Sequence, residues 1–209
     1  MKFITHSYKH ADIVLADDRH KKDYQEIIEV ISSITDEELL THHLAKKDNG
    51  VKSSLAPTIN ALLKRKFIAK GWAPESSIFQ GEEYGNDKVW RLDFARDSVS
   101  IEVAFNHGEA IAWNLLKPVL ASEVNNVDKA IKTEVGVLIT TTRNLKTAGA
   151  FDGAVGEYEK VLRYLIPLST LMSVPLLIIG LEAPETFKLK PKTPKSTDWG
   201  KVINFNEES

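Results

Sequence analysis

The sequence predicts an α/β fold in which a mixed central β-sheet is flanked by helices. Two nearly continuous apolar runs rich in β-branched residues, 133–142 and 174–181, are typical of strands buried on both faces. An alternating stretch at 91–105 is typical of a two-stranded hairpin, and segments with helical periodicity separate these strands. The order hairpin, helix, strand, helix, strand is that of an α/β protein.

The composition narrows the class of protein. The chain has 209 residues, of which 43% are hydrophobic, enough for the core of one domain. Its formal net charge of −2 gives no overall positive field, so a DNA site would have to be a local patch. The absence of cysteine excludes disulfides and a cysteine nucleophile. With no signal peptide and no apolar run long enough for a bilayer, we expect a soluble, cytoplasmic protein with no membrane partner.

The N-terminal part, 1–54, is predicted to be mainly helical. Residues 2–8 suit either an edge strand or an arm. The segment 17–34 opens with acids and places its isoleucines on one stripe, and 35–40 has the threonine and acids of a second helix start. The polar segment 46–54 contains an Asn-Gly turn signal and is predicted to be a loop.

The best-marked helix is predicted at 55–72, where Pro57 suits the first turn and Gly71 the end. Its polar face carries Asn60, Lys64, Lys66 and Lys70. Further helices are predicted at 108–124, with a kink or break at Pro118, and at 156–168. The segment 183–209 is rich in proline and lysine with little periodicity, and is predicted to be an irregular tail.

The hairpin at 91–105 sets two acids face to face. With a turn at 97–98, the predicted register pairs apolar residues throughout: Trp90 with Phe105, Leu92 with Val103, and Phe94 with Ile101. The same register places Asp93 opposite Glu102 and Arg91 opposite Ala104.

Facing carboxylates repel each other, so a protein without a use for them loses stability there. A hard divalent cation such as Mg²⁺ would neutralise Asp93 and Glu102, because it takes oxygen ligands from one or two carboxylates and keeps bound waters. Mn²⁺ is expected to substitute. The alternative is that the acids face solvent, or that Arg91 and Arg96 offset their charge.

The pattern D-x8-E-V-x-F, which runs from Asp93 to Phe105 and follows KGW at 70–72, resembles the BglII and BstYI type II restriction endonucleases. These belong with BamHI to the PD-(D/E)XK nuclease superfamily. The similarity extends over about 55–181 and includes the segments HAD, IEVAF, VGVLI, GEYEKVL and VPLLIIGL. The resemblance implies one nuclease domain over 1–209 with a restriction-endonuclease-like core at 55–182.

Carried over residue by residue, the resemblance implies that Asp93 and Glu102 bind the metal together with the backbone carbonyl of Val103. The family also draws a polar residue from the segment just after the KGW tryptophan, which points to Glu75. The alternative for Glu75 is a solvated acid in a loop at 73–77.

The sequence departs from the family at the third motif position, where Lys, Gln or Glu is usual and this chain has Ala104. Alanine can neither orient nor activate a water. Either the protein is an inactive relative, or another side chain supplies the missing charge. Arg91, predicted to lie across from Ala104, and Lys66, on the polar face of the preceding helix, are the candidates.

Two segments are predicted to contact DNA. Asn106 and His107 directly follow the second strand of the hairpin, and their side chains are able to reach base edges. Arg143, Asn144 and Lys146 leave the end of the strand at 133–142 and suit base and phosphate contacts. The alternative for both segments is loop residues of ordinary polarity.

The leading hypothesis is a Mg²⁺-dependent type II restriction endonuclease that cleaves palindromic double-stranded DNA as a homodimer. By resemblance, its site has a GATC core and a cognate DNA methyltransferase acts on the same site. Two alternatives stay open. One is a DNA-binding protein of the same fold that has lost hydrolysis. The other is a defence or repair nuclease that prefers modified or damaged DNA.

Overall fold

The computed structural model describes residues 1–47, 54–85, 87–123, 127–191 and 198–205. The helices are α1 (Ala11–Ala16), α2 (Lys21–Ser32), α3 (Asp36–Lys47), α4 (Ala56–Ala69), α5 (Glu82–Gly85), α6 (Ile111–Ser122), α7 (Arg143–Ala148) and α8 (Tyr158–Leu168). The strands are β1 (Phe3–Tyr8), β2 (Ala73–Ser77), β3 (Arg91–Arg96), β4 (Val99–Ala104), β5 (Val135–Thr141), β6 (Leu176–Leu181), β7 (Phe187–Leu189) and β8 (Val202–Asn204). Short 3₁₀ turns lie at Lys88–Trp90 and Gly108–Ala110.

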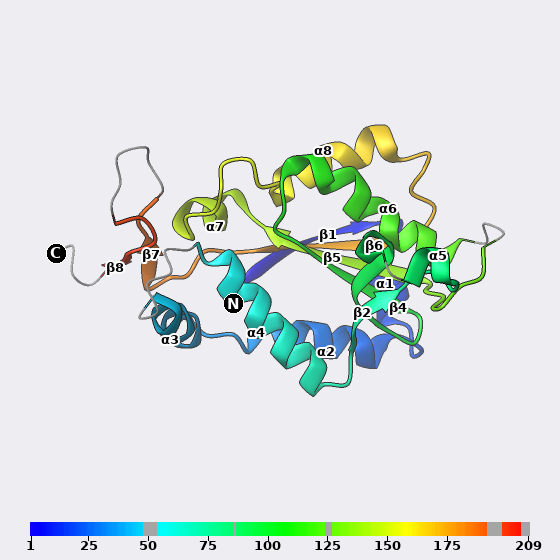
Figure 1. The fold of residues 1–209 in the computed structure, drawn as a ribbon, viewed down its shortest axis with the longest axis horizontal. Helices are drawn as coiled ribbons and strands as arrows, with labels where there is room; N and C mark the ends of the chain where they lie inside the picture. The colour runs from blue at the N-terminus through cyan, green and yellow to red at the C-terminus, as the bar shows by residue number, and fades with distance from the viewer. Residues whose placement is uncertain (48–53, 86, 124–126, 192–197, 206–209) are drawn as a thin grey trace.

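A six-stranded mixed sheet forms the middle layer, in the order β1-β6-β5-β4-β3-β2. The strands β4, β5 and β6 are parallel, whereas β1, β2 and β3 pair antiparallel with their neighbours. Every residue of β5 and β6 is buried, as their continuous apolar runs predict. The predicted fold class, a mixed sheet flanked by helices, is therefore confirmed (Figure 1).

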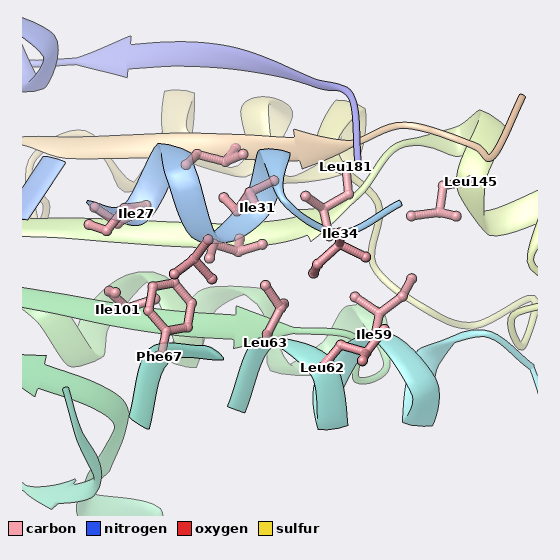
Figure 2. Packing of buried hydrophobic residues seen from close by; sticks show 14 of the residues in the cluster. Ile27, Ile31, Ile34, Ile59, Leu62, Leu63, Phe67, Ile101, Leu145 and Leu181 are labelled. Carbon is pink, nitrogen blue, oxygen red and sulfur yellow. The ribbon is translucent and has the colours of Figure 1, made fainter. Parts of the chain in front are cut away.

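Two helical layers cover the sheet. In Figure 1, α2 and α4 lie below the sheet and α6 and α8 above it. Figure 2 shows Ile27 and Ile31 of α2 and Leu63 and Phe67 of α4 in one buried cluster on the sheet, which also contains Ile101 of β4. A second buried cluster joins α6 and α8 to the opposite face of the sheet. No helix within the described ranges is long and apolar enough to cross a membrane.

Several segments differ from the sequence prediction. Residues 73–77, expected to be a loop, form β2, because they pair with β3 at the sheet edge. The segment after β5 contains α7, whose first turn is capped by the Thr142 side chain. The tail expected to be irregular contains the hairpin β7–β8, because Phe187 and Leu189 bury their side chains in the main core. Residues 48–53 of the predicted loop lie outside the described ranges.

Helix α6 continues through Pro118, so the helix does not break there. The proline packs against the sheet at Gly136 of β5, where an added Cβ would lie 2.7 Å from the Pro118 Cβ and 2.8 Å from the Leu176 Cδ1. The missing side chain at Gly136 is therefore what lets α6 approach the sheet so closely.

We expect Gly136→Ala to lower the free energy of unfolding by about 1–3 kcal/mol, because the extra methyl overpacks this contact. Gly153→Ala is the matched control, since a Cβ at Gly153 would meet nothing within 4 Å. Urea unfolding of both variants measures the difference. Equal midpoints for the two variants would contradict this account of the α6 contact.

Candidate active site

The hairpin of β3 and β4 is closed by backbone pairing only near its turn. The ladder comprises Phe94–Ile101, Ala95–Ser100 and Arg96–Val99. Next to this ladder, carboxylate side chains accept the backbone hydrogen bonds. The Asp93 N–H donates to Glu102 Oε1 at 3.2 Å, and the Val103 N–H donates to Asp93 Oδ2 at 2.7 Å. The two acids are therefore neighbours, as the register predicts, and they lie between strands that have begun to separate.

The predicted pairs beyond this point are wrong. Trp90 ends a 3₁₀ turn and its ring packs against Trp113 of α6, with ring centroids 5.3 Å apart. Phe105 instead packs against Phe151 at 5.6 Å. Arg91 opens β3 and pairs through its backbone with Ser77 of β2, so the ladder with β4 does not extend to it. The inserted carboxylates explain the difference, because they replace the backbone pairing that would have continued the register.

Burial decides the electrostatics of the two acids. The Glu102 side chain is almost inaccessible, at 3% exposed. Removal from water and, next, the nearby Asp93 raise the pKa of Glu102 to about 8, against the opposing effect of the Lys117 ammonium. Burial also raises the pKa of Asp93, although the Val103 N–H and Lys117 lower it. Ionisation of both acids would therefore gather negative charge that the surrounding protein only partly balances.

A pocket of about 220 Å³ opens beside Asp93. It is lined by residues from four elements: Asn60, Lys64, Glu75, Asp93, Phe94 and Val103. The structure therefore brings together three of the residues that the sequence singled out, Glu75, Asp93 and Val103. Glu102 lies deeper, joined to the pocket through its hydrogen bond with the Asp93 N–H.

Glu75 has an unusual backbone in β2. Its neighbours Pro74 and Ser76 pair with Phe94 and Leu92 of β3, but Glu75 itself has a φ of +52° and is not part of this ladder. Such left-handed φ values in residues other than glycine cost on the order of 1 kcal/mol and cluster at functional sites. The turned side chain lies 3.3 Å from the Lys64 ammonium at the pocket.

Lys66, a candidate for the charge that is missing at position 104, lies away from this pocket. Lys66 pairs with Glu38 of α3 at 3.0 Å and does not line the pocket, whereas Lys64 does. The helical repeat places Asn60 and Lys64 on one face, four residues apart, but it does not show which face of α4 meets the pocket. Lys66, two residues further, projects to nearly the opposite side.

Sequence reasoning also missed Lys117. Its ammonium lies 2.8 Å from Glu102 Oε2, and its side chain is only 13% exposed. One signal was present in the sequence, since Lys117 is the single charged residue of the mostly apolar α6. A charge there needs a buried partner.

The sequence model of the family described as restriction endonuclease BglII/BglIII matches residues 3–181. The chain belongs to this family. The resemblance seen in the sequence is thereby confirmed, and by family the protein is a type II site-specific deoxyribonuclease. No curated protein sequence matches the chain.

Solved structures of BglII share the fold. The crystal structure of restriction endonuclease BglII complexed with a DNA 16-mer aligns with a TM-score of 0.66 at 18% identity, covering 98% of this chain and 100% of that one. Free BglII aligns with a TM-score of 0.55 at 17% identity, covering 97% and 92%. At this level of identity the comparison supports the fold, while family membership rests on the sequence match.

The pocket of this BglII-family protein suits a hard divalent cation. Among the described residues no group of three or more His, Cys, Asp or Glu side chains is arranged to hold a metal. The half-buried Asp93 and the buried Glu102, both with raised pKa values, next to the Val103 backbone are ligands of the kind that Mg²⁺ or Mn²⁺ accepts, with water as the remaining ligands. Such an ion would also offset the mutual repulsion of the acids.

The segments predicted to contact DNA follow β4 and β5. Asn106 and His107 are exposed and help line a hollow of about 540 Å³ that also borders Pro57 and Asp152. The Asn106 Oδ1 accepts a hydrogen bond from Asn114 at 2.9 Å, which fixes its amide.

The residues after β5 divide into two kinds. Arg143 and Asn144 are exposed at the start of α7. Lys146 is engaged within the protein, because its ammonium donates to Glu157 and to the Val155 carbonyl, both at 2.8 Å. The structure therefore leaves Arg143 and Asn144 open to a ligand and uses Lys146 to hold the following loop.

Proposed function

We propose that this protein is a single-domain, Mg²⁺-dependent, sequence-specific endodeoxyribonuclease that cleaves palindromic duplex DNA as a homodimer. The observation that carries the proposal is the pair of the half-buried Asp93 and the buried Glu102, beside a pocket that is also lined by Lys64. By resemblance we extend it to a GATC core in the target, to Mn²⁺ as a substitute, and to a cognate methyltransferase that protects the same site in the cytoplasm. The complex of BglII with a DNA 16-mer, whose fold this chain shares, supports DNA as the ligand.

Each part of the pocket has a role in this proposal. Asp93, Glu102 and the Val103 carbonyl would hold the ion, which when bound neutralises charge and activates a water. Lys64 and Asn60 are placed to bind the scissile phosphate, and Glu75 to orient Lys64. Hydrolysis adds the water oxygen to phosphorus and breaks the bond to one bridging oxygen, which takes up a proton. Positioning and charge stabilisation do most of this work.

The test is incubation of the purified protein with plasmid and phage DNA in Mg²⁺, Mn²⁺ or EDTA. Discrete fragments that require metal and carry defined ends would support the proposal. No cleavage in any metal, together with retained duplex binding, would favour the second candidate, an inactive DNA-binding protein. That candidate is favoured by Ala104, which provides no third catalytic group. Digestion of methylated DNA beside unmethylated DNA tests the remaining alternative, a nuclease that prefers modified substrates.

The two lysines of α4 give an internal comparison. We expect Lys64→Ala to lower the rate of cleavage by about tenfold or more, because an ammonium that lines the pocket stabilises the phosphate. Lys66→Ala is the matched control, since Lys66 pairs with Glu38 outside the pocket. Initial rates on one plasmid substrate measure both variants. If the two variants lost activity equally, Lys64 would have no specific role.

A further inference from the structure

Alanine at the third motif position, Ala104, lacks the polar or charged side chain that is usual there, and a residue of another element lies where it could replace that side chain. Ala104 projects from β4 toward α6 and packs in the buried cluster that contains Leu115 and Leu138. Glu102, two residues earlier, projects to the same face of the strand. A charged group arriving from α6 could therefore lie where a longer side chain at position 104 would have placed its own end.

Lys117 is that group. The two oxygens of Glu102 are divided between two donors: Oε1 accepts the Asp93 N–H at 3.2 Å, and Oε2 accepts the Lys117 ammonium at 2.8 Å. This arrangement leaves the carboxylate little freedom to rotate away from Asp93.

The position of Lys117 is itself fixed by the fold. It precedes Pro118, whose ring packs against Gly136 of β5 at a distance that allows no side chain there. The ammonium is consequently held close to the sheet by the contact between α6 and β5. A lysine on a mobile surface helix would have no such constraint.

We propose that Lys117 is a positioning residue that supplies, from α6, the positive charge which the third motif position lacks, and that it orients Glu102 toward Asp93 for cleavage. This inference rests on the proposed nuclease function. It explains how the chain retains both acids while carrying alanine at position 104, and it removes the need for Arg91 or Lys66 in that role.

The test compares Lys117→Met, Lys117→Arg and the double variant Lys117→Met with Ala104→Lys. We expect Lys117→Met to lower kcat on the order of 10²-fold with little change in KM for DNA. Arginine at position 117, or lysine at position 104, is expected to restore the rate by about tenfold or more, because each returns a cation to Glu102.

A second readout separates positioning from a structural role. Titration of DNA-free protein with Mn²⁺ by calorimetry is expected to give Lys117→Met an affinity no weaker than wild type, since the substitution removes a positive charge beside a cation site. Weaker Mn²⁺ binding together with a lower melting temperature, and no recovery in the other two variants, would overturn the inference in favour of a structural role.

The two proposals fail in different ways. If wild type cleaves DNA and Lys117→Met cleaves at a similar rate, the role of Lys117 is overturned and the nuclease function stands. If wild type cleaves no DNA in any metal, the nuclease function is overturned, and the positioning role is overturned with it.

Discussion

Asp93→Asn and Glu102→Gln are each expected to lower the rate of DNA cleavage by on the order of 10³-fold or more, the largest effect anywhere in the chain. Each substitution removes one of the two carboxylates able to bind the metal ion, and a catalytic metal contributes several kcal/mol of transition-state stabilisation. Neither change adds bulk, so the fold should survive. Single-turnover cleavage of a plasmid in Mg²⁺ and in Mn²⁺ measures the loss.

The matched control for these acids is Asp97→Asn. Asp97 lies at the turn of the same hairpin with an exposed side chain, and its φ of +48° is one that asparagine also adopts. We expect this variant to cleave like wild type. If Asp93→Asn kept more than about a tenth of the wild-type rate, the lost transition-state stabilisation would be below about 1.4 kcal/mol. That is too small for the removal of a metal ligand.

In EDTA, the stability of the protein is expected to fall as the pH rises from about 5 to above 8. The pKa of Glu102 is raised to about 8 in the folded protein, whereas an exposed glutamate titrates near 4.3. The folded state therefore binds an extra proton across this interval. The stabilisation from this proton is complete below the pKa of Glu102 in the unfolded chain. It is lost as the pH rises through the pKa of Glu102 in the folded protein. The raised pKa of Asp93 acts in the same direction.

The free energy of unfolding is expected to fall by on the order of several kcal/mol over this pH range, which should appear as a falling melting temperature in a pH series. Glu102→Gln should flatten the dependence, because glutamine stays neutral throughout. Mg²⁺ or Mn²⁺ should stabilise the wild type most at high pH, where the carboxylates are ionised and ready to bind it. A melting temperature that rises with pH in EDTA would show that Glu102 is ionised in the folded protein at neutral pH.

Most of the sheet could be predicted from local patterns. The runs that became β5 and β6 are continuously apolar because both faces are covered, and the alternation at 91–105 placed Asp93 beside Glu102 correctly. The strand β2 gave no such signal. Its pairing with β3 at the sheet edge is a long-range contact, and its residues include a proline, an exposed glutamate and two serines.

The parts of the site that were missed depend on tertiary distances. The choice between Lys64 and Lys66 required the orientation of α4 relative to the sheet, which the isolated polar face of the helix does not specify. Lys117 is fifteen residues from Glu102 in the chain and reaches it because α6 folds back over β4. Neither contact leaves a motif in the sequence.

The open end of the hairpin also provides a spectroscopic probe. The Val103 amide proton is held by the Asp93 side chain instead of by a neighbouring strand. The rate at which this proton exchanges with deuterated solvent should therefore change when the Asp93 carboxyl ionises, while amides inside the β4–β5 ladder stay protected. An isotope-exchange measurement on this single peptide unit would then report the state of the active site in the absence of any nucleic acid.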